Sequence, residues 1–117
     1  MQYAILFYET DEQFATRDHA TEGAAYWGAW RTYVDEIGAS GIVRGGAGLL
    51  APATATTVRL KDGQRHVQDG PFAAAKEQLA GFFLVEVPDI DVALAWAAKA
   101  PSAQYGVEVR PTLPMQT

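Results

Sequence analysis

The stretch Asp69-Gly70-Pro71-Phe72, which continues as Ala73-Ala74-Ala75-Lys76-Glu77-Gln78-Leu79, organises the rest of this sequence. It separates a predicted hairpin from a very apolar run. Gly70 can take backbone dihedrals that other residues avoid, while Pro71 fixes its own φ and has no N–H to donate. The Asp-Gly-Pro triplet therefore predicts a rigid turn.

The residues before this turn, 56–68, have the pattern of a β-hairpin. Asp62-Gly63 is a preferred pair for a two-residue type I′ turn, and such a turn would pair Lys61 with Gln64. Side chains alternate between the two faces of a strand, so this register predicts which residues share a face. One face would carry Val58, Leu60, Arg65, Val67 and Asp69. His66 lies on the other face, so we expect a surface histidine that does not pair with Asp69.

The residues after the turn predict a buried strand, a helix and a final strand. Residues 81–87 are apolar at successive positions, which is typical of a central strand covered on both faces. A proline ends this strand, and an alanine-rich helix is expected at residues 90–100, capped by Asp89 or Asp91. The last strand is expected at residues 107–110.

The first half of the chain predicts a strand, a loop, a helix and a bent strand. Residues 3–8 are rich in large apolar side chains and predict a strand buried on both faces. Residues 9–21 are polar and irregular, so we expect a loop with a solvated His19. Residues 42–50 contain several glycines, and they predict a bulged strand that another backbone approaches closely.

A helix is predicted at residues 22–37, with Thr21 as its N-cap. The periodicity of its apolar residues puts four of them on one face: Trp27, Trp30, Val34 and Ile37. This aromatic stripe either packs on the sheet or lines a ligand pocket, and packing is the commoner role of such a stripe.

The order of these elements predicts a single α+β domain over residues 1–117, of ferredoxin-like type with an inserted hairpin. Two helices can cover only one face of its sheet. The two-sided apolar strand at residues 81–87 therefore predicts that a second copy of the chain covers the other face, as a homodimer.

Composition narrows the classes of function. The 117 residues carry a formal net charge of −5 and no cluster of Lys and Arg, so nucleic-acid binding is not expected. The absence of Cys excludes disulfides and thiolate chemistry, and two distant His residues give no metal-site motif. Gly46-x-Gly48 lacks a following helix to bind a dinucleotide, so no cofactor is assigned. The sequence also shows no signal peptide or membrane span, so a cytoplasmic protein is expected.

Four segments carry a resemblance to a known family: residues 1–8, 52–59, 69–81 and 107–111. On these residues the chain resembles the YCII-related domain family, and within it the branch called the DGPF domain. The resemblance implies a dimeric α/β barrel. It also implies, for some members, a catalytic His–Asp pair with the histidine on the first helix. Trp30 stands at that position here, so the aspartate carries over as Asp69 and the histidine does not.

The candidate site follows from the turn. Asp69 beside apolar neighbours would be partly desolvated, which suits a general acid or base, whereas the alternative is an acceptor for backbone N–H groups in its own turn. The candidate ligand-binding residues are Gly70, Pro71, Phe72, Lys76, Glu77 and Trp30. For the charged pair Lys76 and Glu77, the alternative is that both are solvated surface side chains.

Two functions are consistent with the sequence. By likeness to relatives such as a dehydrochlorinase and the muconolactone isomerases, the chain is a small-molecule lyase or isomerase in which Asp69 moves a proton. The alternative is a non-catalytic ligand-binding or regulatory accessory protein. Members of the DGPF branch are often encoded beside extracytoplasmic-function sigma factors, which favours that alternative.

Overall fold

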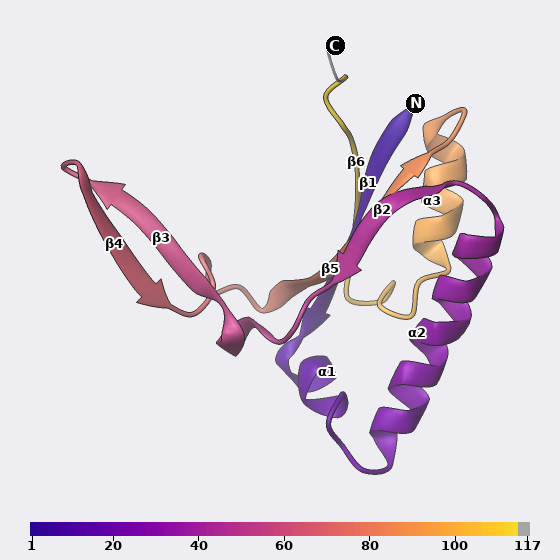
Figure 1. Ribbon diagram of the computed structural model, residues 1–117. Coiled ribbons are helices and arrows are strands. Elements are labelled where there is room, and N and C mark those ends of the chain that lie inside the picture. Colours follow the sequence, from indigo (N-terminus) through magenta and orange to yellow (C-terminus); the bar gives the residue numbers. More distant parts are fainter. Residues whose placement is uncertain (115–117) are drawn as a thin grey trace.

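The structure is a computed structural model and describes residues 1–114 (Figure 1). In chain order its elements are β1 (Gln2–Thr10), α1 (Asp11–Thr16), α2 (Glu22–Ala39), β2 (Val43–Gly48), the 3₁₀ turn η1 (Pro52–Thr54), β3 (Thr56–Lys61), β4 (Gln64–Asp69), β5 (Glu77–Glu86), α3 (Ile90–Ala98) and β6 (Val107–Pro111). No helix within the described range is long and apolar enough to cross a membrane.

Four antiparallel strands form the main sheet in the order β2-β5-β1-β6. With α2 between β1 and β2, and α3 between β5 and β6, this is the ferredoxin-like arrangement that the sequence predicts. The α+β class is therefore confirmed, and β5 is a central strand as expected. Within residues 1–114 the sheet does not close into a barrel.

The core forms between one face of this sheet and the helices. Along β1 every second residue is buried, and Ile5 and Phe7 pack with Tyr33 and Ile37 of α2. Phe7 makes edge-on contacts with Trp30 and Tyr33, at ring-centre distances of 5.2 and 5.8 Å. Burying each such large apolar side chain contributes about 1.5–3 kcal/mol, which fixes α2 against β1. Helices α2 and α3 lie together on this side of the sheet in Figure 1, and α1 lies below the end of β1.

The buried face of α2 differs from the predicted stripe. Tyr26, Tyr33 and Ile37 are its buried large side chains, whereas Trp27 is 50% exposed and Val34 is 43% exposed. Both sets have helical spacing, so periodicity alone could not choose between them. Packing against β1 selects the face that carries the tyrosines, and it leaves Trp27 and Val34 at the edge of a cavity.

The segment predicted as a loop, residues 9–21, is partly helical, and that prediction was wrong. Helix α1 follows β1 directly, and the Thr10 side chain caps it by accepting from the backbone N–H of Gln13 at 3.4 Å. Thr21 occupies the N-cap position of α2, but its side chain makes no capping bond. His19 caps α2 instead, because its Nδ1 accepts from the backbone N–H groups of Thr21 and Glu22, at 3.3 and 3.2 Å.

The glycine-rich strand β2 is bulged and closely approached, as predicted. Its register against β5 shifts between Val43 and Gly45. Gly46 has φ +146°, and a Cβ there would lie 2.3 Å from the Phe82 carbonyl oxygen. A Cβ on Gly81 of β5 would lie 2.9 Å from the Ala47 carbonyl oxygen. These positions require glycine, whereas Gly48 has open space around it.

The β3–β4 hairpin has the predicted register, from Lys61 opposite Gln64 to Thr56 opposite Asp69. It reaches away from the body on the side opposite the helices (Figure 1). The radius of gyration is accordingly 16.1 Å, compared with about 13 Å for a compact chain of about 100 residues. The apolar side chains of the hairpin are exposed, so the single chain does not bury the face that carries Asp69.

The face of the main sheet away from the helices is only half buried. Register and alternation put Ala4 and Leu6 of β1 on this face, beside Phe82 and Leu84 of β5, and all four side chains keep contact with solvent. No helix from residues 1–114 covers them. We call this surface, defined by Ala4, Leu6, Phe82 and Leu84, the open face.

Candidate functional site

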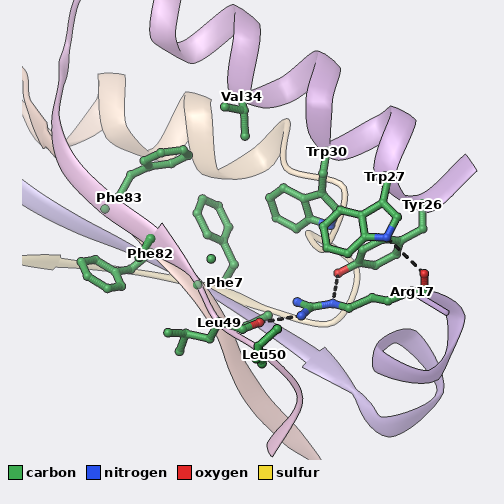
Figure 2. Close-up of a pocket in the computed structure, with 15 residues that line it drawn as sticks. Phe7, Arg17, Tyr26, Trp27, Trp30, Val34, Leu49, Leu50, Phe82 and Phe83 are labelled. Carbon is green, nitrogen blue, oxygen red and sulfur yellow. Dashed lines mark hydrogen bonds between the residues drawn. The ribbon is translucent and has the colours of Figure 1, made fainter. Parts of the chain in front are cut away.

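A cavity of about 430 Å³ lies between α2 and the edge of the sheet formed by β2 and β5. Figure 2 shows Trp27, Trp30 and Val34 pointing into it from α2, with Phe7 and Phe83 across from them. We call it the α2–β2 cavity. Its size and mostly apolar lining are those of a small-molecule site.

The cavity exists because one of its walls has almost no side chains. Gly46 and Gly48 of β2 line it together with Gly81 of β5. A Cβ on Gly46 or Gly81 would meet the backbone of the neighbouring strand, whereas the space around Gly48 is open. Leu49 and Leu50, which follow β2, form the lower wall in Figure 2. The close strand approach that requires Gly46 and Gly81 therefore also leaves room for a ligand.

A buried carboxylate lies behind one end of this cavity. Glu9 is the last inward-facing residue of β1 and is only 1% exposed. Its oxygens accept hydrogen bonds from the Tyr26 hydroxyl at 2.6 and 2.7 Å and from Trp30 Nε1 at 3.2 Å. Arg17 Nη2 completes the set at 3.4 Å, which is also an ion pair. We call these four residues the Glu9 cluster.

Arg17 joins the Glu9 cluster to the cavity wall. Its Nε donates to the Tyr26 hydroxyl at 2.9 Å, and its Nη1 donates to the carbonyl oxygen of Leu49 (Figure 2). The guanidinium also lies over the rings of Phe14 and Trp27, at 4.8 and 5.3 Å from their centres. Stacking and hydrogen bonding together hold this cation in one place, as suits an arginine that binds planar anionic groups.

Tyr26 remains protonated in this environment. Burial, reinforced by the neighbouring Glu9 carboxylate, holds the pKa of the Tyr26 hydroxyl well above its usual value of 10.0. Its phenol proton is thus kept for the bond to Glu9 while its oxygen accepts from Arg17. Tyr26 therefore acts as a fixed link between the cation and the carboxylate, and not as a base.

Asp69, the predicted acid–base residue, ends β4 and is exposed in the single chain. It does not line the α2–β2 cavity. Its carboxylate forms no ion pair or hydrogen bond with any group in residues 1–114, so neither the expected desolvation nor a turn-acceptor role is present there. Within the described residues the Asp69 carboxylate is therefore free of partners.

The turn that follows Asp69 is anchored to the segment after β2. Gly70 has φ +104°, its N–H donates to the Ala55 carbonyl at 2.7 Å, and its carbonyl accepts from Thr57 Oγ1 at 2.8 Å. Pro71 and Phe72 border a second hollow of about 390 Å³. This turn hollow shares Leu49 and Leu50 with the α2–β2 cavity. The two leucines are thus the wall between the two sites.

Of the other predicted ligand-binding residues, one lies in the α2–β2 cavity and two lie outside it. Trp30 lies in the α2–β2 cavity and binds Glu9, whereas Lys76 and Glu77 are exposed before and at the start of β5. The structure does not bring Asp69, Lys76 and Glu77 together with Trp30 in one cavity. Residues 1–114 contain no group of three or more His, Asp or Glu residues arranged to hold a metal ion.

Three residues of the Glu9 cluster were missed from the sequence. A signal for one of them was present, because the alternation of Tyr3, Ile5 and Phe7 extends in steps of two to Glu9. Treating residues 9–21 as a loop ended the strand too early. For Arg17 and Tyr26 no local pattern exists, since they meet Glu9 only after α1 and α2 have folded back on β1.

The fold and the cavity define a ferredoxin-like α+β protein with a small-molecule-sized site between a helix and a sheet edge. Residues 1–116 match the model of the YCII-related domain, and the chain belongs to that family. Membership of the DGPF branch stays a prediction.

Two known proteins extend this comparison. The uncharacterised protein R00369 of Rhizobium meliloti (strain 1021) is 42% identical over 84 residues, which is 69% of this chain and 64% of that protein. The chain thus spans less than two thirds of that relative's length. The structure of 5-chloro-2-hydroxyhydroquinone dehydrochlorinase (TftG) from Burkholderia phenoliruptrix AC1100, in complex with 2,5-dihydroxybenzoquinone, has a TM-score of 0.57. That match covers 97% of this chain and 94% of TftG at 13% identity, so it shows a shared fold alone.

Proposed function

We propose that the chain is a small-molecule enzyme of the lyase or isomerase class whose substrate occupies the α2–β2 cavity. The observation that carries this proposal is a cavity of about 430 Å³ with apolar aromatic walls and a fixed cation at one end. TftG, which shares the fold, is a dehydrochlorinase that binds 2,5-dihydroxybenzoquinone. That ligand is a flat oxygenated ring, and a ring of this kind is the substrate class we propose here.

Asp69 is proposed as the acid–base residue. A lyase or isomerase of this type needs a base that takes a proton from carbon while the electron pair forms a new double bond. The lone pairs of Glu9 are engaged by Tyr26, Trp30 and Arg17, whereas Asp69 makes no such bonds within residues 1–114. Its turn borders the hollow next to the cavity, which supports this choice.

A homodimer, closing as a dimeric α/β barrel, is proposed as the form that completes the site. The open face is apolar and half exposed, and the hairpin reaches out on that same side with Val58 and Leu60 exposed at 58% and 77%. A second copy packed over the open face and against the hairpin would bury both surfaces. The same packing would remove Asp69 from bulk water, which a general base near an apolar substrate needs.

A non-catalytic ligand-binding or regulatory accessory protein, linked to extracytoplasmic-function sigma factors, is the second candidate. Trp30 favours it. Its Nε1–H is engaged with Glu9, and an indole can neither accept nor exchange a proton in the way that a histidine can. The cavity would then hold its ligand without transforming it.

Proton exchange at carbon distinguishes the two candidates without knowledge of the leaving group. The protein is incubated in D₂O with a panel of hydroxylated quinones that includes 2,5-dihydroxybenzoquinone, and loss of ring C–H signals is followed by proton NMR. We expect the parent to accelerate exchange, Asp69→Asn to abolish it, and Gly48→Leu to abolish it by filling the cavity. Ligand binding with no exchange above the buffer rate would favour the accessory role.

A further inference from the structure

We propose that Arg17 is the binding residue for an oxyanion, a carboxylate or phenolate carried by a flat ring, at the end of the α2–β2 cavity next to the Glu9 cluster. This inference rests on the proposed function only in that the ligand occupies the same cavity. It adds the charge of the ligand, the residue that recognises that charge, and the role of Glu9.

The hydrogen bonds of Arg17 leave donors for a ligand. A guanidinium has five N–H groups. Three bonds are formed within the described part of the chain, one each from Nε, Nη1 and Nη2, to Tyr26, Leu49 and Glu9. One N–H therefore remains on each terminal nitrogen. Two such donors are what a carboxylate accepts in a bidentate pair.

The charges are arranged so that the cavity presents the positive partner. Arg17 lines the cavity, whereas Glu9 does not and lies behind Tyr26 and Trp30. Arg17 is the one charged side chain among the residues that line this cavity in the described chain. A ligand thus meets a cation in apolar surroundings, where its electrostatic attraction for an anion is stronger than in water.

Glu9 determines the strength of this attraction as well as the position of Arg17. The carboxylate and the Tyr26 hydroxyl fix the guanidinium from behind, at 3.4 and 2.9 Å. Because the Glu9 charge partly cancels that of Arg17, binding of an anion is weaker than it would be to an uncompensated arginine. We therefore infer that Glu9 is a positioning residue that also keeps the affinity for the anion moderate.

The aromatic walls of the cavity select a flat ring. Trp27 and Trp30 from α2 face Phe7 and Phe83 across it, and Trp27 lies next to Arg17 (Figure 2). The edge-on contacts of Phe7 with Trp30 and Phe83 hold these walls in place, at ring-centre distances of 5.2 and 5.9 Å. Aromatic walls of this kind bury a planar apolar ring, while Arg17 lies where a charged substituent of that ring would point.

A pair of probes with the same shape and different charge tests this inference. Naphthalene-2-carboxylate and naphthalene-2-carboxamide are titrated into the full chain at pH 7.5 and low salt, by isothermal calorimetry. We expect the carboxylate to bind about tenfold more tightly, as a charge-assisted hydrogen-bond pair implies. Arg17→Met keeps the aliphatic stem over the aromatic rings and should bind both probes equally.

A second variant keeps the test decisive if Arg17→Met fails to fold. Glu9→Gln retains an acceptor for Tyr26 and Trp30 but removes the counter-charge, so carboxylate affinity should rise by roughly fivefold while carboxamide affinity stays unchanged. A purely structural role of Glu9 would not produce this gain.

Two contrary results have different meanings. If the parent binds both probes equally and Gly48→Leu abolishes both, the oxyanion role of Arg17 is overturned while the cavity remains a binding site. If the parent binds neither probe, there is no ligand site in this cavity, and the inference fails together with the proposed function.

Discussion

Replacing Glu9 by alanine tests how much the Glu9 cluster contributes to stability. The change removes the acceptor for Tyr26, Trp30 and Arg17 and leaves the Arg17 cation, whose side chain is 12% exposed, without its counter-ion. Breaking a buried ion pair from one side costs about 3–5 kcal/mol. Arg17 keeps its bonds to Tyr26 and Leu49 and some contact with solvent, so we expect the lower end, about 3 kcal/mol.

The assay is urea unfolding at pH 7, followed by tryptophan fluorescence and circular dichroism. A domain of this size has about 5–15 kcal/mol of stability, so Glu9→Ala should fold with a clearly lowered midpoint. Asp11→Ala is the matched control, because that carboxylate is exposed in the first turn of α1, and its loss should cost about 1 kcal/mol or less. Glu9→Gln, which keeps an acceptor, should fall between the two.

A small effect would refute this reasoning. If Glu9→Ala lowers the free energy of unfolding by no more than Asp11→Ala does, then the Glu9 carboxylate is hydrated in solution and Arg17 is not held by it. The proposal that Glu9 positions Arg17 would then be wrong as well.

Three further predictions follow from the same structure. Gly46→Ala should lower the free energy of unfolding in urea by about 3 kcal/mol, because a Cβ there meets the backbone of β5 and φ is +146°. Gly48→Ala should lower it by about 1 kcal/mol or less. Equal costs would contradict the close approach of the two strands at Gly46. Burial holds the pKa of Tyr33 above its usual value of 10.0, so native Tyr33 keeps a proton that the unfolded chain loses. The stability of the parent relative to Tyr33→Phe should therefore fall by about 1.4 kcal/mol per pH unit above about pH 10, and a constant difference would disprove it. Sedimentation equilibrium at micromolar concentration should give twice the chain mass, while Leu6→Glu on the open face should give monomer; a monomeric parent would exclude the proposed dimer.

The hairpin was predictable to the residue because its register depends on local chemistry. Asp62 and Gly63 both have positive φ, as a type I′ turn requires, and this turn fixes every pair from Lys61 opposite Gln64 onward. The order of the strands and of the two longer helices was predictable for a related reason, since each of these elements shows its own period and its own end signals, whereas the short helix α1 was missed. What these signals do not contain is the direction in which the hairpin points.

The site was less predictable, since its parts meet only in the folded chain. Arg17, Gly48 and Phe83 come from three separate segments, and none has a neighbour in sequence that marks it as part of a cavity. For Trp27 the aromatic stripe left both packing and pocket lining open, and only the folded chain shows that it lines the cavity. The prediction for Gly48 shows the same limit. The glycines of residues 42–50 predicted a strand that another backbone approaches closely, but the structure shows open space around Gly48.

The indole of Trp30 bears on the roles of two carboxylates, Glu9 and Asp69. A histidine at this position could take a proton from a substrate and pass it on, but an indole only donates. Trp30, Tyr26 and Arg17 all donate hydrogen bonds to Glu9. Glu9 therefore serves as an acceptor that holds the Arg17 guanidinium in place. The acid–base chemistry proposed here therefore needs a carboxylate that is free of such bonds, and Asp69 meets that condition within residues 1–114. If Asp69→Asn leaves the accelerated exchange of the parent unchanged, Asp69 is not the base. If the parent itself binds ligand but does not accelerate exchange, ligand binding without catalysis becomes the better account of the cavity.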